Sequence, residues 1–321
     1  MTGLLDAVAE AGERLVALSG NRIRFDAWRA LARGDDLQLA APGLWSPNRH
    51  CRLVRCSDGW MAVSLARTDD RDLVPAWTGA ALDADPWEAV ISAAPLRSGE
   101  EIVAAGVELH LPVALVGEAS PPAPSLLAKG ARNEGVVIDL SALWAGPYCG
   151  ALIAEAGHRV IKIESPGRPD PTAQHTPRLD ARLNGAKTRQ RMALDGGELL
   201  ETIGTARALI TSGRPHALAR LGLDEARLFA LNPDLLWIAI TAHGWRGAAA
   251  MRVGFGDDCA AAGGLVRWNG DTPNFIGDAL ADPLSGIMAA TLAIEALADG
   301  RRGLLDISLA GTAATFAKTM T

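Results

Sequence analysis

The loop Ser141–Pro147 is the first stretch whose residues suggest chemistry, because it joins an apolar run at 135–140 to a helical pattern at 146–156. A loop between a strand and a helix can offer backbone N–H groups to an anionic or polar ligand. It lacks the G-x-G-x-x-G spacing of dinucleotide-binding folds, and Trp144 would block the close approach of a pyrophosphate. The loop therefore argues against NAD binding, whereas binding of another polar ligand remains possible.

Asp282 is the second such place, since it directly precedes a long apolar helical pattern at 283–298. Asp is favourable at a helix N-cap, so capping is the simpler interpretation from the residues alone. The four cysteines show no C-x-x-C pair and the six histidines show no metal-ligand spacing. We therefore expect no metal site, and His243, in the turn 241–244, is the one histidine that merits a test.

Composition narrows the class of protein. The chain has 321 residues, 49% of them hydrophobic, and a net charge of −6. Residues 1–128 hold 11 basic and 17 acidic side chains, whereas 129–321 hold 20 of each and all four lysines. This balance argues against a nucleic-acid partner. We see no signal peptide and no membrane span, and the unpaired cysteines favour a cytoplasmic protein.

Two segments of different character position these residues. The first is expected to hold a helix at 2–19, a hairpin at 51–65 around Asp58–Gly59, two short helices and a strand at 111–116. A proline-rich linker follows, and then strands and helices alternate. We predict an α/β protein: a Rossmann-like, mostly parallel sheet with helices on both faces at 134–321, a linker at 121–133, and a smaller α+β domain at 1–120.

Collinear motifs in the second segment carry a family resemblance. Segment 136–166 (VVIDLSALWAGPYCGALIAEAGHRVIKIESP) is similar to the opening of the family III CoA-transferases, the CaiB/BaiF group that includes formyl-CoA transferase and α-methylacyl-CoA racemase. The same order of motifs continues through 183–187 (LNGAK), 193–195 (ALD), 214–222 (RPHALARLG), 231–233 (LNP), 238–244 (IAITAHG), 281–286 (ADPLSG) and 300–309 (GRRGLLDISL).

The resemblance implies an enzyme that moves CoA from an acyl-CoA donor to a carboxylic acid, with Asp282 as the nucleophile. In the family, the Asp at this place attacks the acyl-CoA carbonyl, and a mixed anhydride and then an aspartyl-CoA thioester form. Such covalent catalysis replaces one difficult exchange by easier acyl transfers. With the resemblance, catalysis is the preferred role of Asp282, and capping is compatible with it.

The resemblance also implies residues that contact CoA. Because its phosphates are anionic, they need cations. The candidates by position are Arg168, Lys187, Arg220 and Arg252, of which Arg220 matches a family position associated with the nucleotide. Trp144 and Ala145 lie in the loop that borders the pantetheine and thioester end.

Three departures keep alternatives open. Phe255 occupies the place of the histidine base of the racemase branch, which disfavours an α-methylacyl-CoA racemase-like isomerase. Trp144 replaces a Gln of formyl-CoA transferase, and a later Gly-rich loop has no counterpart. A catalytically degenerate CoA-binding partner protein is therefore the third possibility.

Residues 48–116 resemble the small domain that follows the large domain in this family, so the order of the two is exchanged here. A homodimer is still expected, since the family's active site forms at the subunit contact.

Overall fold

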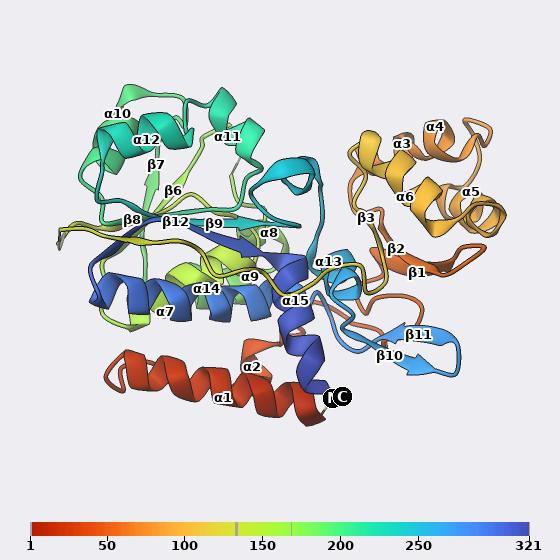
Figure 1. The fold of residues 1–321 in the computed structure, drawn as a ribbon, viewed down its shortest axis with the longest axis horizontal. Coiled ribbons are helices and arrows are strands. Elements are labelled where there is room, and N and C mark those ends of the chain that lie inside the picture. Colours follow the sequence, from red (N-terminus) through yellow and green to blue (C-terminus); the bar gives the residue numbers. More distant parts are fainter. Residues whose placement is uncertain (1, 132–133, 168, 321) are drawn as a thin grey trace.

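A sheet of seven strands forms the centre of the large unit in the computed structural model, which describes residues 2–131, 134–167 and 169–320 (Figure 1). The strand order is β4 (Ala128–Lys129), β12 (Arg301–Ser308), β9 (Leu236–Thr241), β8 (Ala208–Thr211), β5 (Val137–Asp139), β6 (Val160–Glu164) and β7 (Thr188–Arg191). Edge strand β4 is antiparallel and the other pairings are parallel. The predicted Rossmann-like α/β fold is confirmed.

Helices cover both faces of this sheet, which explains why β9 is buried along its whole length (Figure 1). One face carries α10 (Gly197–Gly204), α11 (Pro215–Arg220) and α12 (Glu225–Leu231), and the other carries α7 (Ala145–Glu155) and α14 (Ala281–Ala298). Helix α14 is long and apolar enough to cross a membrane, with a mean hydropathy of 1.3. However, 72% of it is buried inside the protein, as in the core helix of a folded domain.

The strand order reverses at β5. The chain passes from β5 to β6 and β7 on one side, then returns to β8, β9 and β12 on the other. In open α/β sheets, ligands bind beyond the carboxyl ends of the strands at such a switch point. The loop with Trp144 follows β5 and α11 follows β8, so the fold brings the two predicted ligand-binding segments to this place.

A smaller unit packs beside the sheet's carboxyl edge (Figure 1). The expected hairpin is present as β1 (Cys51–Arg55) and β2 (Trp60–Ser64), and β3 (Val113–Leu115) joins β2. Its helices are α3 (Thr68–Asp72), α4 (Val74–Thr78), α5 (Pro86–Ala93) and α6 (Gly99–Glu108). Met61, Val63 and Val113 pack with Trp77 in a separate core.

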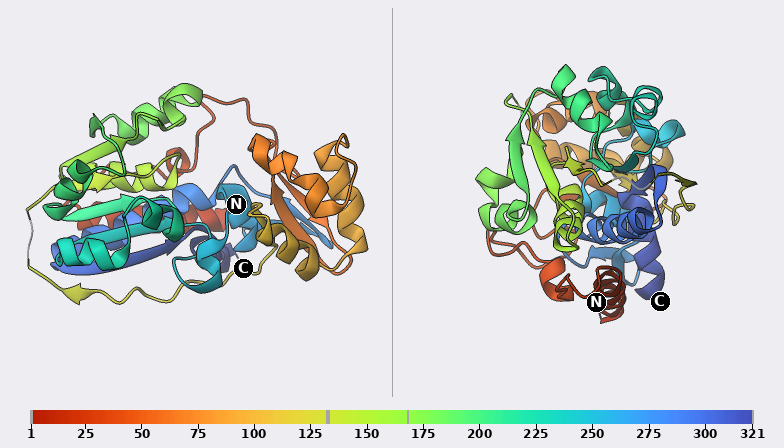
Figure 2. Two further views of the ribbon diagram at one scale, coloured as in Figure 1. Left: turned by 90° about the horizontal axis from the view of Figure 1, so that it is seen from above. Right: turned by 90° about the vertical axis from the view of Figure 1, so that its left-hand side faces the viewer.

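The domain expected at 1–120 needs a correction at its N-terminal end. Helix α1 (Thr2–Leu18) and α2 (Ala27–Ala30) pack against the large unit, and Leu4, Val8 and Leu15 are fully buried in its core. The apolar periodicity of a helix predicts that one of its faces is buried, but it does not show which part of the protein buries it. The packing of α1 against the large unit could therefore not be predicted from the sequence. The start of α1 contacts η3 (Lys318–Met320), and the two chain ends lie side by side (Figure 2).

Several further elements were not expected. The stretch 165–190, predicted as a polar loop, contains α8 (Thr172–His175), α9 (Pro177–Asn184) and part of β7. In α9, the polar side chains of Asp180 and Asn184 are buried and hydrogen-bonded to each other. Because the buried face of this helix is partly polar, its sequence shows no clear hydrophobic periodicity. The other elements that the sequence did not predict are a hairpin of β10 (Val266–Asn269) and β11 (Thr272–Phe275), and the helix α13 (Gly256–Ala262). Helix α15 (Leu309–Ala317) matches the predicted terminal helix.

Candidate active site

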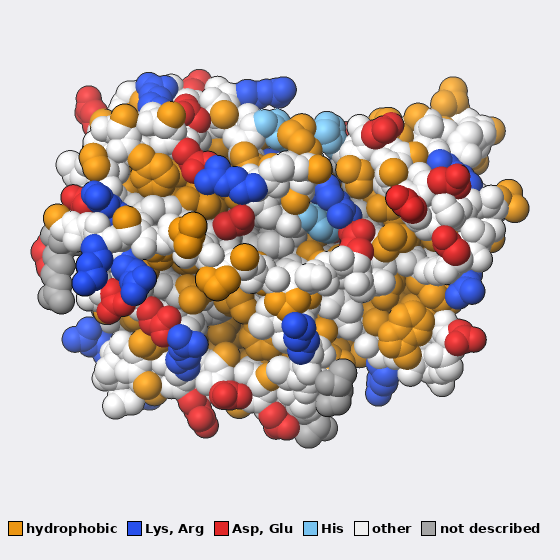
Figure 3. Space-filling model, in the orientation of Figure 1, with side chains coloured by type: hydrophobic (Ala, Val, Ile, Leu, Met, Phe, Trp, Pro, Cys, Tyr) orange, Lys and Arg blue, Asp and Glu red, His pale blue; other side chains and the backbone are white. Residues whose placement is uncertain are grey.

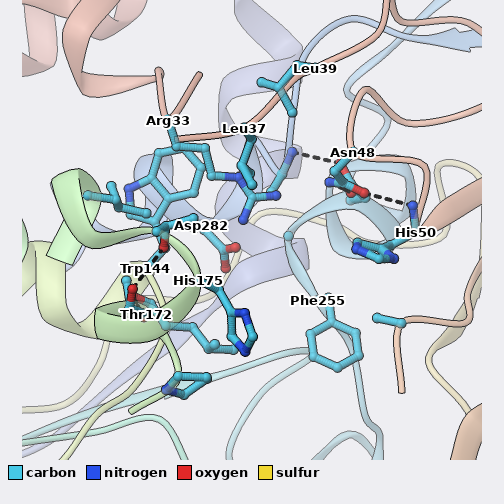
Figure 4. A pocket seen from close by; sticks show the side chains of 18 of the residues that line it. Arg33, Leu37, Leu39, Asn48, His50, Trp144, Thr172, His175, Phe255 and Asp282 are labelled. Atoms are coloured by element: carbon cyan, nitrogen blue, oxygen red, sulfur yellow. Dashed lines mark hydrogen bonds between the residues drawn. The ribbon is translucent and has the colours of Figure 1, made fainter. Parts of the chain in front are cut away.

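A pocket of about 460 Å³ lies where the large unit, the small unit and the N-terminal segment 31–50 meet (Figure 4). Its wall is mostly apolar, with a few charged and polar groups. The lining residues are Arg33, Leu37, Gln38, Leu39, Asn48, His50, Ser64, Ala66, Leu143, Trp144, Pro171, Thr172, His175, Thr176, Leu179, Phe255, Gly256, Asp257, Ala279 and Asp282. Asp282 and Trp144 are thus brought together, although they lie far apart in the sequence.

Asp282 stands in the first turn of α14, where Leu280 occupies the N-cap position. No described residue donates a hydrogen bond to its carboxylate, so capping is not its role in this structure. The carboxylate faces the pocket together with the Arg33 guanidinium (Figure 4). A side chain that is placed in a pocket without a structural partner is free to react.

Several carboxyl groups crowd around Asp282. Burial raises the pKa of Asp282 to about 7; Arg33 lowers it, whereas Asp257, Asp278 and Asp258 raise it. Burial also raises the pKa of Asp257 to about 6, with Asp278 adding to the effect. Two neighbouring carboxyl groups with pKa values raised towards neutrality, those of Asp257 and Asp282, are typical of functional sites.

The turn before α14 is held by a network from distant segments. Ala279 adopts a left-handed conformation (φ 47°), and its N–H donates to Asp257 Oδ1 at 2.7 Å. Asn48 Nδ2 donates to both Asp257 Oδ2 and Asp278 Oδ1, at 2.7 and 2.6 Å. A non-glycine residue at positive φ is strained, and such strain persists only where the surroundings enforce it. The network therefore fixes the direction from which Asp282 enters the pocket.

Gly256 lies directly under the Asp282 carboxylate. A Cβ at this position would lie 2.5 Å from Asp282 Oδ2 and 2.7 Å from both the Cβ and the O of Ala279. These distances are shorter than any van der Waals contact, so only glycine leaves the carboxylate where it is. Gly256 is thus a positioning residue, and the sequence analysis did not identify it.

We predict that Gly256→Ala lowers the CoA transfer implied by the family resemblance by about tenfold or more, with CoA binding retained, because the added methyl displaces the Asp282 carboxylate. The measurement is kcat beside a CoA dissociation constant. Gly197→Ala is the matched control, since a Cβ there meets nothing within 4 Å. Full activity in Gly256→Ala would contradict the assigned contact.

Two buried ion pairs secure the loop that carries Trp144. Lys187 Nζ lies 2.7 Å from Asp139 Oδ2 and also donates to Pro147 O and Asn184 Oδ1. Lys162 pairs with Asp170 at 3.1 Å. All three donors of the Lys187 ammonium are thereby used and its side chain is fully buried, so this residue is structural and does not reach a CoA phosphate as the resemblance implied.

The other expected CoA contacts are placed differently. Trp144 lines the pocket, and Ala145 is buried behind it as the first residue of α7. Arg252 is engaged by Glu118 and by Val113 O, so it connects the two units rather than facing open solvent. Arg220 is exposed at the end of α11. Arg168 lies outside the described residues.

Arg220 belongs to a group of cations that spans the large and small units. The pKa of His216 is lowered by burial and by the charges of Arg214, Arg220 and His110. Burial, Arg67 and Arg220 likewise lower the pKa of Arg214. Figure 3 shows basic and histidine side chains where the two units meet. These shifts report positive charges held close together, which suits an anionic ligand.

This cation group adjoins the pocket. The Arg67 guanidinium carbon lies 5.5 Å from the ring centroid of Phe255, and Phe255 lines the pocket. Phe255 therefore links the pocket to Arg67, whose guanidinium is itself paired with Asp70.

His243, Asp258 and Cys259 bring possible metal-binding atoms within 4.8 Å of one another. Asp258 Oδ1 already accepts from Ser64 Oγ and from the N–H of Phe255, as the carboxylate that caps α13. Burial raises the pKa of the Cys259 thiol well above its ordinary value, which keeps it protonated. We therefore assign no ion to this group.

Sequence reasoning missed the part of the site that precedes the hairpin. Arg33 and Asn48 carry no motif, and they lie in the segment that was predicted to belong to another domain. Asp278 lies four residues before Asp282, and this spacing of two acidic residues was the one feature of the sequence that could have identified Asp278 as part of the site.

Similar proteins were found by sequence and by structure. A succinyl-CoA–D-citramalate CoA-transferase of Chloroflexus aurantiacus is 32% identical over 180 residues, which cover 52% of this chain and 45% of that protein. A succinate–glutarate CoA-transferase of Agrobacterium fabrum is 28% identical over 197 residues, covering 54% of this chain and 49% of that protein. The chain thus spans about half the length of the curated relatives it matches.

Among solved structures, the protein Rv3272 of Mycobacterium tuberculosis superposes with a TM-score of 0.53 at 26% identity, covering 61% of this chain and 59% of that one. A CaiB/BaiF family protein of Brucella suis has a TM-score of 0.52 at 24% identity, over 59% of this chain and 55% of that one. Residues 133–321, more than half of the chain and including the whole parallel sheet, match the family model for CoA-transferases of family III. The protein belongs to CoA-transferase family III.

Proposed function

We propose that this protein transfers CoA from an acyl-CoA donor to a carboxylic acid through a covalent intermediate on Asp282. The observation that carries the proposal is the Asp282 carboxylate, which stands at the pocket wall with no hydrogen bond from any described residue. Burial raises its pKa to about 7, and the ionised form is available at neutral pH. Membership of the family and the CoA-transferase names of the relatives support the reaction class.

The proposed reaction needs only the acyl-CoA donor, the acceptor acid and Asp282. A carboxylate oxygen of Asp282 attacks the acyl-CoA carbonyl and displaces CoA thiolate, which leaves an acyl–aspartyl anhydride. The thiolate then attacks the aspartyl carbonyl and releases the donor acid, which leaves an aspartyl-CoA thioester. An acceptor carboxylate attacks this thioester, and the displaced thiolate attacks the acceptor's carbonyl in the new anhydride. The products are a new acyl-CoA and free Asp282.

The position of the cation group beside the pocket supports CoA as the ligand. Acyl-CoA has a thioester at one end and three phosphate groups towards the other, joined by the long, thin pantetheine arm. Arg214 and Arg220 provide guanidinium groups for the phosphates, whereas Arg67 is paired with Asp70. The apolar wall around Leu143 and Phe255 suits the arm.

Trapping the intermediate tests this function. The protein is incubated with succinyl-CoA, then treated with hydroxylamine or borohydride and digested for mass spectrometry. We expect the modification on the peptide that contains Asp282, and none in protein kept without acyl-CoA. CoA binding without modification at Asp282 would overturn the transferase and favour a CoA-binding partner protein.

We predict that replacing Arg214 and Arg220 by Gln raises the dissociation constant of CoA by about tenfold or more, since charge-assisted hydrogen bonds contribute roughly 1.5–3 kcal/mol each. Calorimetry with CoA and with pantetheine makes the measurement, and pantetheine binding is expected to stay unchanged. Arg301→Gln, a charge removal on the opposite edge of the sheet, is the control. Equal weakening for both ligands would contradict a phosphate contact.

The racemase alternative has a separate readout. Phe255 lines the pocket where that branch has a base, and phenylalanine transfers no proton. We expect no deuterium from D₂O at the α-carbon of a bound acyl-CoA. Homodimer formation and a cytoplasmic location stay predictions, and sedimentation of the purified protein tests the first.

A further inference from the structure

Arg33 reaches the pocket from a segment that has no motif. The chain after α2 crosses from the large unit to the small unit (Figure 2), and residues of this crossing segment, among them Arg33, Leu37 and Asn48, line the pocket. The Arg33 side chain is 20% exposed and lines the same cavity as Asp282. It therefore places a permanent positive charge beside the reacting carboxylate.

The guanidinium is held rigidly on one edge. Its Nε and Nη2 both donate to Asp278, and Asp278 Oδ1 also accepts from Asn48. The guanidinium carbon lies 5.3 Å from the ring centroid of Trp144, which supports its plane. Because these contacts already fix the side chain, a ligand that binds to it does not have to restrict it further.

The other edge of the guanidinium is open. Asp278 uses Nε and Nη2, whereas Nη1 donates to no residue in the described part of the chain. Arginine has five donors in a flat fork, and a planar carboxylate is the ligand that matches two of them at once. His50 and Asn48 border the same hollow as further polar groups (Figure 4).

We infer that the open edge of Arg33 binds a second carboxylate on the acid substrate, so that the site selects dicarboxylic acids. The inference rests on the proposed function, because it assigns the acid whose other carboxylate reacts at Asp282. Apolar side chains such as Leu37, Leu39 and Phe255 line the pocket and suit the short carbon chain between the two carboxylates.

The order of the reaction makes this role electrostatically favourable. While Asp282 is ionised, its charge and that of Asp278 both balance Arg33. Once Asp282 carries CoA as a thioester, that charge is gone and Arg33 has one neighbouring carboxylate fewer. The positive charge is therefore least compensated at the stage when the acceptor acid must bind.

A different role for Arg33 makes a different prediction. If Arg33 served only to keep Asp282 ionised, its removal would slow transfer to every acid equally and shift the pH profile. A carboxylate-binding role instead affects acids that have a second carboxylate. The pair succinate and butyrate separates these roles, since both have four carbons and only succinate has the second carboxylate.

The kinetic test uses the variant Arg33→Gln with Asp278→Asn, so that Asp278, the carboxylate hydrogen-bonded to Arg33, is not left buried with its charge unpaired. We expect the ratio of kcat/KM for succinate over butyrate to fall roughly ten- to a hundredfold, by the loss of one charge-assisted contact. Arg29→Gln, which changes an exposed arginine of α2 just before that segment, is the control and leaves the ratio unchanged. An unchanged ratio in the double variant would overturn the inference.

A binding test does not depend on turnover. In Asp282→Asn protein the neutral amide stands for the thioester-bearing side chain, and calorimetry measures free succinate and butyrate. We expect succinate to bind more tightly than butyrate, and the preference to vanish when Arg33→Gln and Asp278→Asn are added and to return in part with Arg33→Lys. Circular dichroism and thermal unfolding show that each variant folds.

The two proposals fail in different ways. If no acid accepts CoA but succinate binding depends on Arg33, the transferase proposal is wrong and the carboxylate site is supported. If CoA transfer proceeds and succinate has no advantage that Arg33 controls, the transferase stands and the dicarboxylate site is wrong.

Discussion

Asp282→Asn is expected to abolish CoA transfer, with a fall in kcat of more than about a thousandfold, because an amide cannot form the anhydride on which the proposed steps depend. The pocket wall and the cation group are unchanged by this substitution, so the CoA dissociation constant is expected to stay within about threefold of the original. The measurements are acyl-CoA exchange followed by chromatography and calorimetry with CoA.

The same variant carries a stability signature whose sign follows from the pKa of Asp282. Burial raises that pKa to about 7, whereas an unfolded Asp titrates near ~3.9, so the folded state holds the proton more tightly. The contribution of this group to the free energy of unfolding is therefore fully present below pH 4 and is lost as the pH rises through 7.

We thus expect Asp282→Asn to be more stable than the original protein at pH 8, by about 1–3 kcal/mol, and nearly equal to it at pH 4. Thermal or urea unfolding at both pH values makes the comparison. Asp85→Asn is an exposed control, an N-cap Asp in the small unit that is remote from the pocket. Retained transfer in Asp282→Asn would rule out the covalent mechanism, whatever its stability.

Lys187→Met is expected to be the most destabilising of the single substitutions, because it leaves Asp139 buried without its counter-charge. Breaking a buried ion pair from one side typically costs about 3–5 kcal/mol. The Asp139 carboxylate is fully buried, and although burial alone acts against the ionised form, the charges of Lys187 and Lys162 lower its pKa. Urea unfolding at pH 7 measures the loss.

The matched variant is Lys187→Met with Asp139→Asn, which removes both charges and is expected to recover at least half of the lost stability. If Lys187 instead bound a CoA phosphate, Lys187→Met would raise the CoA dissociation constant with little change in unfolding. That outcome would contradict the structural role that its three acceptors indicate.

The sequence predicted the parallel sheet and Asp282 for local reasons. Uncharged apolar runs such as 236–240 have the length and composition of strands buried on both faces, and short helical patterns between them require crossovers. Asp282 was identified because its motif is contiguous with the helix that carries it. The contacts that each residue makes were harder to predict from the sequence. A lysine such as Lys187 is a residue type that often binds phosphate, and only its burial beside Asp139 shows that it forms a structural ion pair.

By itself, then, the sequence determined the family and the α/β architecture and singled out the carboxylate that we propose reacts, since each depends on residues that are neighbours along the chain. The tertiary structure alone decided what surrounds that carboxylate. Arg33 and Asp278 are 245 residues apart in the sequence and become partners only because residues of segment 31–50 line the pocket. Asp257 and Asp278 likewise come close to Asp282 only in the folded protein, because contacts between turns leave no periodic pattern in the sequence.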